Sequence, residues 1–452
     1  MSWNLQQING TQPTVPNAEQ IRCTGAPPVG SNQPVFVCTF GSQQHFVYVD
    51  SGRALVDCYS NVQASASHWN WAPITGAGGL FPKVSQPAKP PFVCAFGDEL
   101  HFTYIDGNEH VQDFCYSGGD FTDIANWKQQ QINAGVVSNA PKAVSALFVC
   151  VFQSQLHFAY LDTNDNIQDC FYDGAGSQAD PNHWHLQQIN NGKLVTVSAE
   201  YVACPDAPAV GGGLDLTPAL FVATFENQQH FTYTDADSNL QDCVYDGNSN
   251  TWQVYARTGG SWPFSSPAPS GYPSGTSVSV CVFGTQLHFV YVDANLRLQD
   301  WFFDSAKQYA PEWALWQIVN TGAPTMPGDT VVCPDAIVPM LNTSWWCAFA
   351  YNGLLQSKEL HYVYLDLNGN IQDVFLEETS DFQQWTLRQI NGTVAMVDAE
   401  SIACSSAPKG GPPFLSAFGD ELHYTYVDDN NAVQDIVWTP ILRAIPIPVG
   451  YI

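Results

Sequence analysis

The stretch from His157 to Asp169 reads HFAYLDTNDNIQD. It begins with alternating apolar residues, passes through a polar cluster at 162–166, and ends on an Asp that stands twelve residues after the His. Apolar segments on both sides of a short polar cluster predict two antiparallel strands joined by a tight hairpin. Such a hairpin places His157 and Asp169 on neighbouring strands of one sheet, close enough for their side chains to interact.

The same stretch recurs along the whole chain. Seven histidines are each followed by Tyr three residues later, by Asp five residues later, and by a further Asp twelve residues later. The pairs are His45 and Asp57, His101 and Asp113, His157 and Asp169, His230 and Asp242, His288 and Asp300, His361 and Asp373, and His423 and Asp435. The residue before the second Asp is Gln in every copy except the first, which has Val56. Seven copies with one fixed spacing predict seven equivalent structural units.

Each copy lies within a longer unit. A β-rich run such as FVCAF at residues 92–96 precedes the His, and a second run leads to a segment such as WHLQQIN at residues 184–190. This last segment begins at Trp69, Trp127, Trp184, Trp252, Trp313 and Trp385. The unit is therefore predicted to be an antiparallel meander of four strands.

The seventh unit stops before its last strand. The matching segment, WNLQQIN, stands at the other end of the chain and begins at Trp3. The N-terminal strand is thus expected to complete the last unit, which makes a closed ring, whereas a linear solenoid caps its ends instead of joining them. The predicted fold is all-β: a seven-bladed β-propeller of four-stranded antiparallel blades.

The 452 residues are expected to form one domain, 1–452. We place the blades at residues 11–76, 77–134, 135–191, 192–258, 259–321 and 322–392, and the seventh at 393–440 plus 1–10. The apolar tail, 441–452, fits no unit and is expected to pack against the ring.

The chain is strongly acidic, with 14 Lys and Arg against 42 Asp and Glu and a formal net charge of −28. Such a surface repels phosphate groups, which excludes nucleic acid partners and membrane insertion from the expected functions. The start, MSWNLQQING, lacks the regions of a secretory signal, so we expect a cytoplasmic protein, or one exported without a classical signal peptide. The 13 cysteines recur at repeat-equivalent positions, which favours small apolar side chains over disulfides. The oligomeric state stays open.

Two interpretations of the repeated residues remain. In the first, His, Asp and the fourth-strand Trp form a buried, hydrogen-bonded anchor in each blade, since a buried polar group without partners is costly. In the second, they bind a sugar between neighbouring blades, where imidazole and carboxylate share its hydroxyls and the indole covers an apolar face. Several such pockets on one ring would raise avidity. The candidate ligand-binding residues are the seven His–Asp pairs and the seven tryptophans given above.

The unit resembles that of the fungal fucose-specific lectins, and the resemblance spans essentially the whole chain. The repeats of that family carry a basic residue at the start of strand two, an acidic residue at the start of strand three, and an aromatic-rich fourth strand. By this match the seven histidines take the place of the family's sugar-binding Arg, and the seven paired aspartates take the place of its Glu. Those lectins have six blades. The resemblance implies a multivalent glycan-binding propeller that recognises glycans or glycoconjugates, with the sugar left open, because His offers fewer donors than Arg.

Two other classes of function are the alternatives. One is a protein-interaction scaffold that binds no sugar, and the other is a glycan-active enzyme such as a glycosidase or lyase. A sialidase-like site needs clustered arginines, and none of the six arginines occupies a repeated position. Catalytic carboxylates are usually a single pair, whereas these recur in every unit. No catalytic residue is therefore predicted.

No cofactor and no metal site are predicted. The polar clusters at 162–166 and 235–239 superficially resemble calcium loops, but they lack the turn glycine and the bidentate Glu. No third ligand accompanies the His–Asp pairs at regular spacing, which argues against a transition-metal site.

Overall fold

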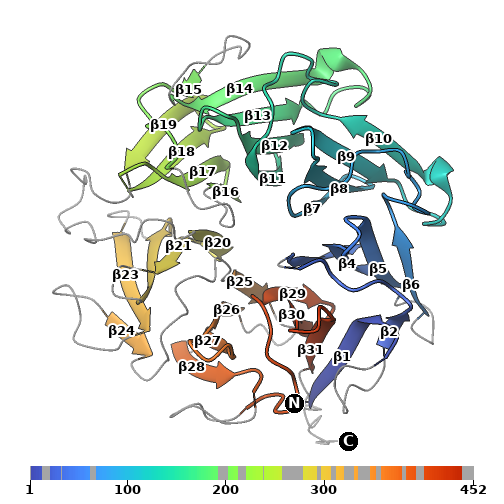
Figure 1. Ribbon diagram of the computed structural model, residues 1–452. Helices are drawn as coiled ribbons and strands as arrows, with labels where there is room; N and C mark the ends of the chain where they lie inside the picture. The colour runs from blue at the N-terminus through green and yellow to red at the C-terminus, as the bar shows by residue number, and fades with distance from the viewer. Residues whose placement is uncertain are drawn as a thin grey trace, which may run out of the picture.

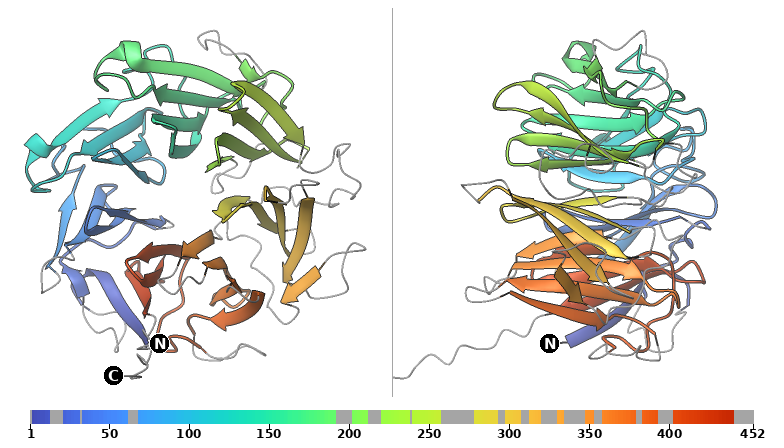
Figure 2. Two further views of the ribbon diagram at one scale, coloured as in Figure 1. Left: turned by 180° about the vertical axis from the view of Figure 1, so that it is seen from behind. Right: turned by 90° about the vertical axis from the view of Figure 1, so that its left-hand side faces the viewer.

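The computed structural model describes residues 2–12, 21–31, 33–61, 68–191, 202–211, 220–237, 239–256, 278–292, 297–306, 312–319, 330–333, 347–352, 358–378, 383–392 and 402–439. Within these ranges the chain forms seven β-sheets and no α-helix. The sheets are arranged as blades around a central axis (Figure 1). The side view shows the ring as a disc, with the strands running across its thickness (Figure 2). The predicted all-β, seven-bladed propeller is confirmed.

Each blade has its first strand next to the axis and its fourth strand at the rim (Figure 1). From the axis outward, blade 1 contains β3 (Val35–Phe40), β4 (Gln43–Val49), β5 (Leu55–Asn61) and β6 (His68–Pro73). Blade 2 contains β7 (Phe92–Phe96), β8 (Glu99–Ile105), β9 (Val111–Tyr116) and β10 (Trp127–Gln131). Blade 3 contains β11 (Ser145–Phe152), β12 (Gln155–Leu161), β13 (Ile167–Tyr172) and β14 (Trp184–Asn190). Blade 4 contains β16 (Leu220–Phe225), β17 (Gln228–Thr234), β18 (Leu240–Asp246) and β19 (Thr251–Ala256).

The remaining blades follow the same order. Blade 5 contains β20 (Ser279–Phe283), β21 (Gln286–Val292), β22 (Leu298–Asp304) and β23 (Glu312–Val319). Blade 6 contains β25 (Cys347–Asn352), β26 (Lys358–Leu365), β27 (Ile371–Glu378) and β28 (Gln383–Gln389). Blade 7 contains β29 (Phe414–Phe418), β30 (Glu421–Val427), β31 (Val433–Thr439) and the N-terminal β1 (Ser2–Gly10). Two short 3₁₀ helices, η1 (Ile124–Asn126) and η2 (Pro181–His183), precede the fourth strands of blades 2 and 3.

The N-terminal strand closes the ring. β1 pairs with β31 in antiparallel register, with Ser2 opposite Thr439 and Gln7 opposite Gln434. The apolar side chains of Leu5 and Ile8 are buried in this strand. A strand from the start of the chain therefore completes the last blade, as the split repeat predicts.

Three sheets carry a fifth strand that the repeat did not predict. β2 (Ile21–Thr24), β15 (Val202–Cys204) and β24 (Thr330–Cys333) run parallel to β1, β14 and β23. In blades 1, 2 and 6 a single parallel bridge stands at the corresponding place. The chain thus continues along the rim of one blade before it crosses to the next. The tail at 441–452 lies outside the described residues.

The first strands form the inner wall of the ring, since each contacts the first strands of both neighbouring blades. Five phenylalanines at one repeat position contact one another in sequence around the axis, with centroids 5.0–6.0 Å apart. They are Phe414, Phe36, Phe92, Phe148 and Phe221. Among the described residues, no helix is of a length and hydropathy suited to crossing a membrane, and eleven cysteines are free thiols.

An Asn at the end of the fourth strand fixes the depth of the third. In blade 3, Asn190 Oδ1 accepts a hydrogen bond from the backbone N–H of Ile167 at 2.7 Å, and its Nδ2 donates to the carbonyl of Pro208 at 2.9 Å. Asn9, Asn133 and Asn391 make the same contacts in blades 7, 2 and 6. This clamp explains why the segment ends in Ile-Asn so often, and it locks strand three in the register that places its Asp.

Candidate functional site

In each of the seven blades, the structure places the His next to the Asp that stands twelve residues after it. Each His is on the second strand and each Asp on the third, and Nδ1 of the His lies 2.7–3.0 Å from a carboxylate oxygen. Every His and Asp of these pairs is at most 3% exposed. Because an ionised carboxylate only accepts hydrogen bonds, Nδ1 carries the hydrogen and Nε2 faces the other way.

Burial and pairing shift the pKa values of these groups differently from blade to blade. Burial raises the pKa of Asp57, and His45 lowers it only in part. At Asp113 burial also raises the pKa, but His101 and the neighbouring donors lower it more, so that the net shift is downward. At His361 burial lowers the pKa, but the carboxylates of Asp373 and Glu359 raise it by more than burial lowers it, so that the pKa is about 9. Blade 6 therefore holds a protonated imidazole between two carboxylates at neutral pH.

The Asp of each pair has further partners that depend on the blade. Where Thr stands two residues after the His, its hydroxyl donates to the second carboxylate oxygen, as Thr103 does to Asp113 at 3.0 Å. Where the fourth strand offers Gln three residues after its Trp, the amide donates to the Asp, as Gln187 does to Asp169 at 2.7 Å. These contacts tie the second, third and fourth strands of a blade to one carboxylate.

Two blades also receive a hydroxyl from the next blade. Tyr362 and Tyr424 stand directly after their histidines, where the other blades have Phe, and so lie on the opposite face of strand two. Tyr362 donates to Asp300 of blade 5 at 2.6 Å, and Tyr424 donates to Asp373 of blade 6 at 2.7 Å. The face of a blade that carries the His–Asp pair is therefore covered by the next blade.

A residue that sequence reasoning missed stands two positions before every His. It is Gln or Glu in all seven copies: Gln43, Glu99, Gln155, Gln228, Gln286, Glu359 and Glu421. Because side chains on a strand alternate, this residue shares the face of the His, and Glu359 lies 3.0 Å from Nε2 of His361. The constant amide or acid at this spacing was the signal that could have identified it.

The rest of the repeated motif builds the hairpin and the link to the preceding blade. The hairpin Asp, five residues after the His, accepts backbone N–H bonds across the turn; Asp162 does so from Asn164 at 2.8 Å and Asn166 at 3.1 Å. Its other oxygen accepts from the Gln that precedes the paired Asp, as from Gln168 at 3.0 Å. Tyr160, three residues after the His, donates to the carbonyl of Pro141 in the segment that enters the blade. In the cluster at 162–166, which resembles a calcium loop in sequence, the oxygens of the Asp thus accept hydrogen bonds of the turn.

The tryptophans do not lie with the His–Asp pair of their own blade. In blade 3 the strands pair His157 with Phe171 and His185, while Trp184 pairs with Tyr172 one position away, on the opposite face. Six of the seven predicted tryptophans, all except Trp313, contact the residue that directly follows the His, with centroids 5.3–5.8 Å apart. The prediction of one His, Asp and Trp cluster within a blade is therefore wrong, because the fourth strand's register puts Trp on the other face.

The tryptophans instead face the preceding blade. Trp385 contacts Trp316 of blade 5 at 5.3 Å, and Trp3 lies 5.1 Å from the guanidinium carbon of Arg388 in blade 6. Trp127 and Trp184 are buried, whereas Trp3, Trp69, Trp252 and Trp385 are half-buried. The side chain of Trp313 lies outside the described residues. An indole and the His–Asp pair of the preceding blade thus lie on the two facing sides of a blade interface, not within one sheet.

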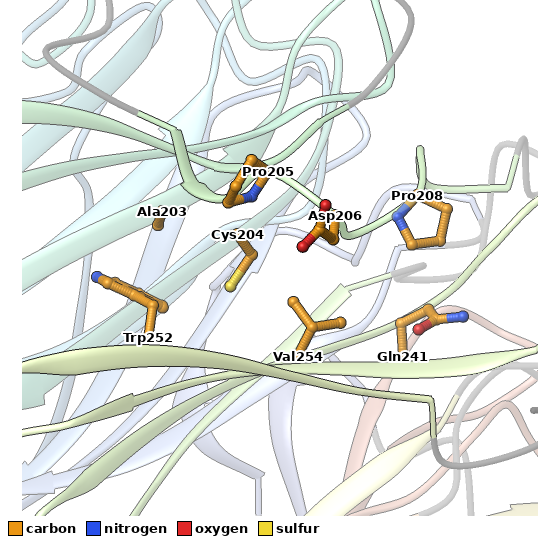
Figure 3. Close-up of a pocket in the computed structure, with 8 residues that line it drawn as sticks. All are labelled: Ala203, Cys204, Pro205, Asp206, Pro208, Gln241, Trp252 and Val254. Carbon is orange, nitrogen blue, oxygen red and sulfur yellow. The ribbon is translucent and has the colours of Figure 1, made fainter. Parts of the chain in front are cut away.

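One pocket with a volume of about 510 Å³ opens at such an interface, between blades 3 and 4. Figure 3 shows side chains from the segment that leaves blade 3 facing side chains from blade 4. The lining residues are Ala203, Cys204, Pro205, Asp206 and Pro208 on one side, and Gln241, Trp252 and Val254 on the other. Trp252 is the predicted site residue that lines it; His230 and Asp242 do not.

Neither a protein-family model nor a curated protein matches the chain. Solved structures do: AofleA from Arthrobotrys oligospora has 10% identity and a TM-score of 0.43, over 77% of this chain and 81% of that one. The fucose-specific lectin from Aleuria aurantia has 12% identity and a TM-score of 0.43, over 80% and 96%. Polysaccharide lyase Uly1 has 9% identity and a TM-score of 0.48, over 97% of both chains.

The similar structures thus include fungal fucose-specific lectins, the family that the repeat resembles. One structure of the Aleuria aurantia lectin is described as a six-bladed β-propeller, whereas this chain forms seven blades. Similarity at this level does not extend to a ligand or an activity.

Proposed function

We propose that the protein is a carbohydrate-binding propeller and that the pocket between blades 3 and 4 is one of its sugar sites. The observation that carries this proposal is the chemistry of the pocket. Trp252 offers an indole for an apolar sugar face, and Asp206 offers a carboxylate for hydroxyl groups. Gln241 offers its amide oxygen, because its amide nitrogen donates to Asp235 at 2.7 Å. A volume of about 510 Å³ lies within the usual range of small-ligand pockets, roughly 300–1,000 Å³.

The charge of the pocket favours a neutral sugar. Asp206 is exposed, and the chain as a whole carries a formal charge of −28. Sialic and uronic acids would therefore meet a repulsive field, whereas hydroxyl groups of a neutral sugar can donate to the carboxylate.

The parts of this pocket recur at other interfaces, which supports several sites per ring. Cys204 and Ala207 of the crossing segment share a hydrophobic cluster with Trp252. In the same way, Cys23 and Ala26 share a hydrophobic cluster with Trp69, and Cys404 and Ala407 share one with Trp3. The residue matching Asp206 is Gly25 in one of these segments and Ser406 in the other, so we expect the grooves to differ in affinity.

In this proposal the buried His–Asp pairs support the grooves from behind. Their burial leaves the carboxylates and Nδ1 atoms to hydrogen bonds within and between blades, and the sugar contacts fall to Trp252, Asp206 and Gln241, which line the pocket. The ligand-binding role predicted for the pairs stays a prediction, which a double variant, His157→Ala with Asp169→Ala, tests. We expect a lower melting temperature, because the variant empties a buried polar cluster. Weaker sugar binding at an unchanged melting temperature would instead favour direct contact.

The proposed site is tested with the purified full chain on an array of neutral and acidic glycans, followed by calorimetric titration of the best neutral sugar. Trp252→Ala and Asp206→Asn should each remove one site from the measured stoichiometry or weaken it by roughly tenfold, as expected for the loss of a stacking surface or a charged hydrogen bond. Asp98→Asn makes the same change at an exposed carboxylate in blade 2 and should leave binding unaltered.

Absence of binding to every glycan, together with a stable protein partner in a pull-down, would overturn the proposal in favour of the scaffold alternative. Cleavage of a glycan on the array would favour the enzyme alternative.

A further inference from the structure

Blade 2 departs from the other blades at one position beside its His–Asp pair. Two residues after the paired Asp, the other blades have an aromatic or aliphatic residue: Tyr59, Phe171, Val244, Phe302, Phe375 and Val437. The four aromatic residues stack on their histidines, with centroids 5.0–5.9 Å apart. In blade 2 this position is Cys115, whose Sγ lies 3.3 Å from Nδ1 of His101. A thiol therefore replaces the ring that covers the imidazole.

The same blade has an acid on the other side of the imidazole. Glu99 stands two residues before His101, and its Oε2 lies 4.0 Å from Nε2. Ligand atoms of Glu99, His101 and Cys115 all lie within 4.8 Å of one another, the only such group of three or more His, Cys, Asp or Glu within the described ranges. Carboxylate, imidazole and thiol are the three kinds of side chain that hold Zn²⁺ in proteins.

His101 is oriented as a metal-binding histidine is. Its Nδ1 is held by Asp113 at 2.9 Å, which aims Nε2 away from that carboxylate. A metal-ligating His almost always donates its other ring N–H to a carboxylate or carbonyl in this way. The side chain is fully buried, and Nε2 makes no hydrogen bond to any described residue. A buried ring nitrogen is thus directed toward Glu99 without a partner at hydrogen-bonding distance.

The separation between these two atoms suits an ion. A hydrogen bond between nitrogen and oxygen spans roughly 2.7–3.2 Å, so the gap of 4.0 Å is too long for one. A zinc ion bound at about 2.0–2.1 Å from nitrogen and about 2.0–2.2 Å from oxygen reaches both atoms after a small closing movement. The surrounding groups can follow that movement, because Glu99 is the first residue of β8 and its side chain is 17% exposed.

The other contacts of Glu99 are with groups that a cation can replace. Lys128, whose side chain is 67% exposed, lies 2.6 Å from Oε1, and the amide of Gln178 donates to Oε2 at 3.1 Å. Oε1 of Gln178 lies 3.9 Å from Sγ of Cys115. This oxygen, or a water molecule, can serve as the fourth ligand of the ion. Lys128 is therefore the positive charge that a bound metal would displace from the carboxylate.

We propose that Glu99, His101 and Cys115 form a site for a divalent transition-metal ion of intermediate softness, such as Zn²⁺. Thiolate and imidazole select such an ion over Mg²⁺ or Ca²⁺, which prefer oxygen ligands. Burial raises the pKa of the Cys115 thiol, so the metal-free site holds a neutral thiol, and binding releases its proton to solvent. The site is independent of the proposed sugar pocket, which lies between blades 3 and 4.

The test titrates the full chain, stripped of metal with a chelator, with Zn²⁺ by calorimetry and with Co²⁺ by absorption spectroscopy. We expect one Co²⁺ per chain and the near-ultraviolet band that arises from charge transfer between sulfur and cobalt. Cys115→Ser should abolish this band, and Glu99→Gln should weaken binding by roughly tenfold or more. Lys128→Gln removes the competing charge and should strengthen binding.

The control is Cys170→Ser, which changes another fully buried thiol, in blade 3, on the strand face opposite the His–Asp pair. It should keep the cobalt band. Circular dichroism of each variant checks that the blades are intact. A wild-type chain that binds no Co²⁺, or a sulfur-to-cobalt band that persists in Cys115→Ser, would overturn the proposal.

Discussion

In six of the seven blades, a single side chain two residues after the His determines whether the second carboxylate oxygen of the buried Asp has a hydrogen bond. Thr103, Thr232 and Thr425 stand there in blades 2, 4 and 7 and donate to the second carboxylate oxygen at 3.0–3.3 Å. In blades 1, 3 and 5 the residue is Val47, Ala159 or Val290. There, Oδ1 of the paired Asp is buried and accepts no hydrogen bond from the described residues. We therefore expect this repeat position to contribute more stability in blades 2, 4 and 7 than in blades 1, 3 and 5.

A reciprocal pair of substitutions tests this difference. Thr103→Val leaves Oδ1 of Asp113 unpaired and should lower the free energy of unfolding by about 1–3 kcal/mol. Val47→Thr supplies the missing donor to Asp57 and should be neutral or stabilising. A buried hydroxyl without a partner is destabilising, so this result requires that the new hydroxyl donates to Asp57. Thermal or denaturant unfolding measures both.

The control is Val111→Thr, which places the same hydroxyl in an apolar cluster of blade 2 and should destabilise. If Val47→Thr destabilises as much as Val111→Thr, the hydroxyl does not reach Asp57.

The sequence predicts the His–Asp contact but not the side of the blade on which Trp lies. The His-to-Asp spacing is always twelve residues, and a short hairpin with a constant length fixes which residues face each other. The spacing from that Asp to the fourth-strand Trp runs from 10 residues before Trp252 to 15 before Trp184. Because a shift of one residue turns a side chain to the other face of a sheet, a linker of variable length leaves the face of Trp undetermined.

At the level of strands and blades, hydroxyl and charged groups cross the interface between some neighbouring sheets. Between blades 6 and 7, Tyr424 of β30 donates to Asp373 of β27, and that Asp also contacts His361 of β26. Arg388 of β28 adds a cation between the rings of Phe375 and Trp3. This interface also joins the last two blades of the chain to the N-terminal strand.

The charge on His361 makes the stability of this interface depend on pH. Its pKa of about 9 in the folded chain exceeds the ordinary value of 6.5. The stabilisation is therefore fully present below about pH 6.5 and is lost as the pH rises through 9, up to about 3 kcal/mol in all. The melting temperature measured from pH 6 to 10 should fall over this window.

The Glu359→Gln variant removes one of the two carboxylates that raise the pKa of His361, so its melting temperature should fall less over the same window. Glu421→Gln is the matched change in blade 7, where the carboxylate is 40% exposed and lies 3.8 Å from His423, and it should have a smaller effect. An NMR titration of the His361 ring checks the assignment. An unshifted midpoint in Glu359→Gln would contradict the role of that carboxylate.

At the scale of the whole molecule, the ring is held by the pairing of its two ends. Gln6 of β1 donates to Asp435 of β31 at 2.6 Å, and Asn9 accepts from the backbone of Val433 at 2.8 Å. The split repeat predicted this closure because WNLQQIN is the one segment missing from the seventh unit. The fifth, parallel strands were not predicted, because segments such as 202–204 are three or four residues long and carry no alternation of their own.

Removal of residues 1–12 should open blade 7 and lower the melting temperature of the chain. The truncated chain loses the buried side chains of Leu5 and Ile8, each worth about 1.5–3 kcal/mol, and exposes the edge of β31. A synthetic peptide with the sequence of β1 should restore the melting temperature when added in excess, because it binds the folded chain.

A peptide that carries Ile8→Asp is the control and should not restore it. A truncated chain that melts with the full-length protein, with or without peptide, would show that β1 does not hold the ring together.

The direction of β1 determines how the ring responds to force. Ser2 lies opposite Thr439, so the start of β1 and the end of β31 are at the same end of their antiparallel ladder. A pull applied between these two points loads the hydrogen bonds one after another, as in opening a zip, instead of loading all of them together in shear. We therefore expect the seam to open strand pair by strand pair under tension between Ser2 and Thr439, even though it is tightly packed at rest.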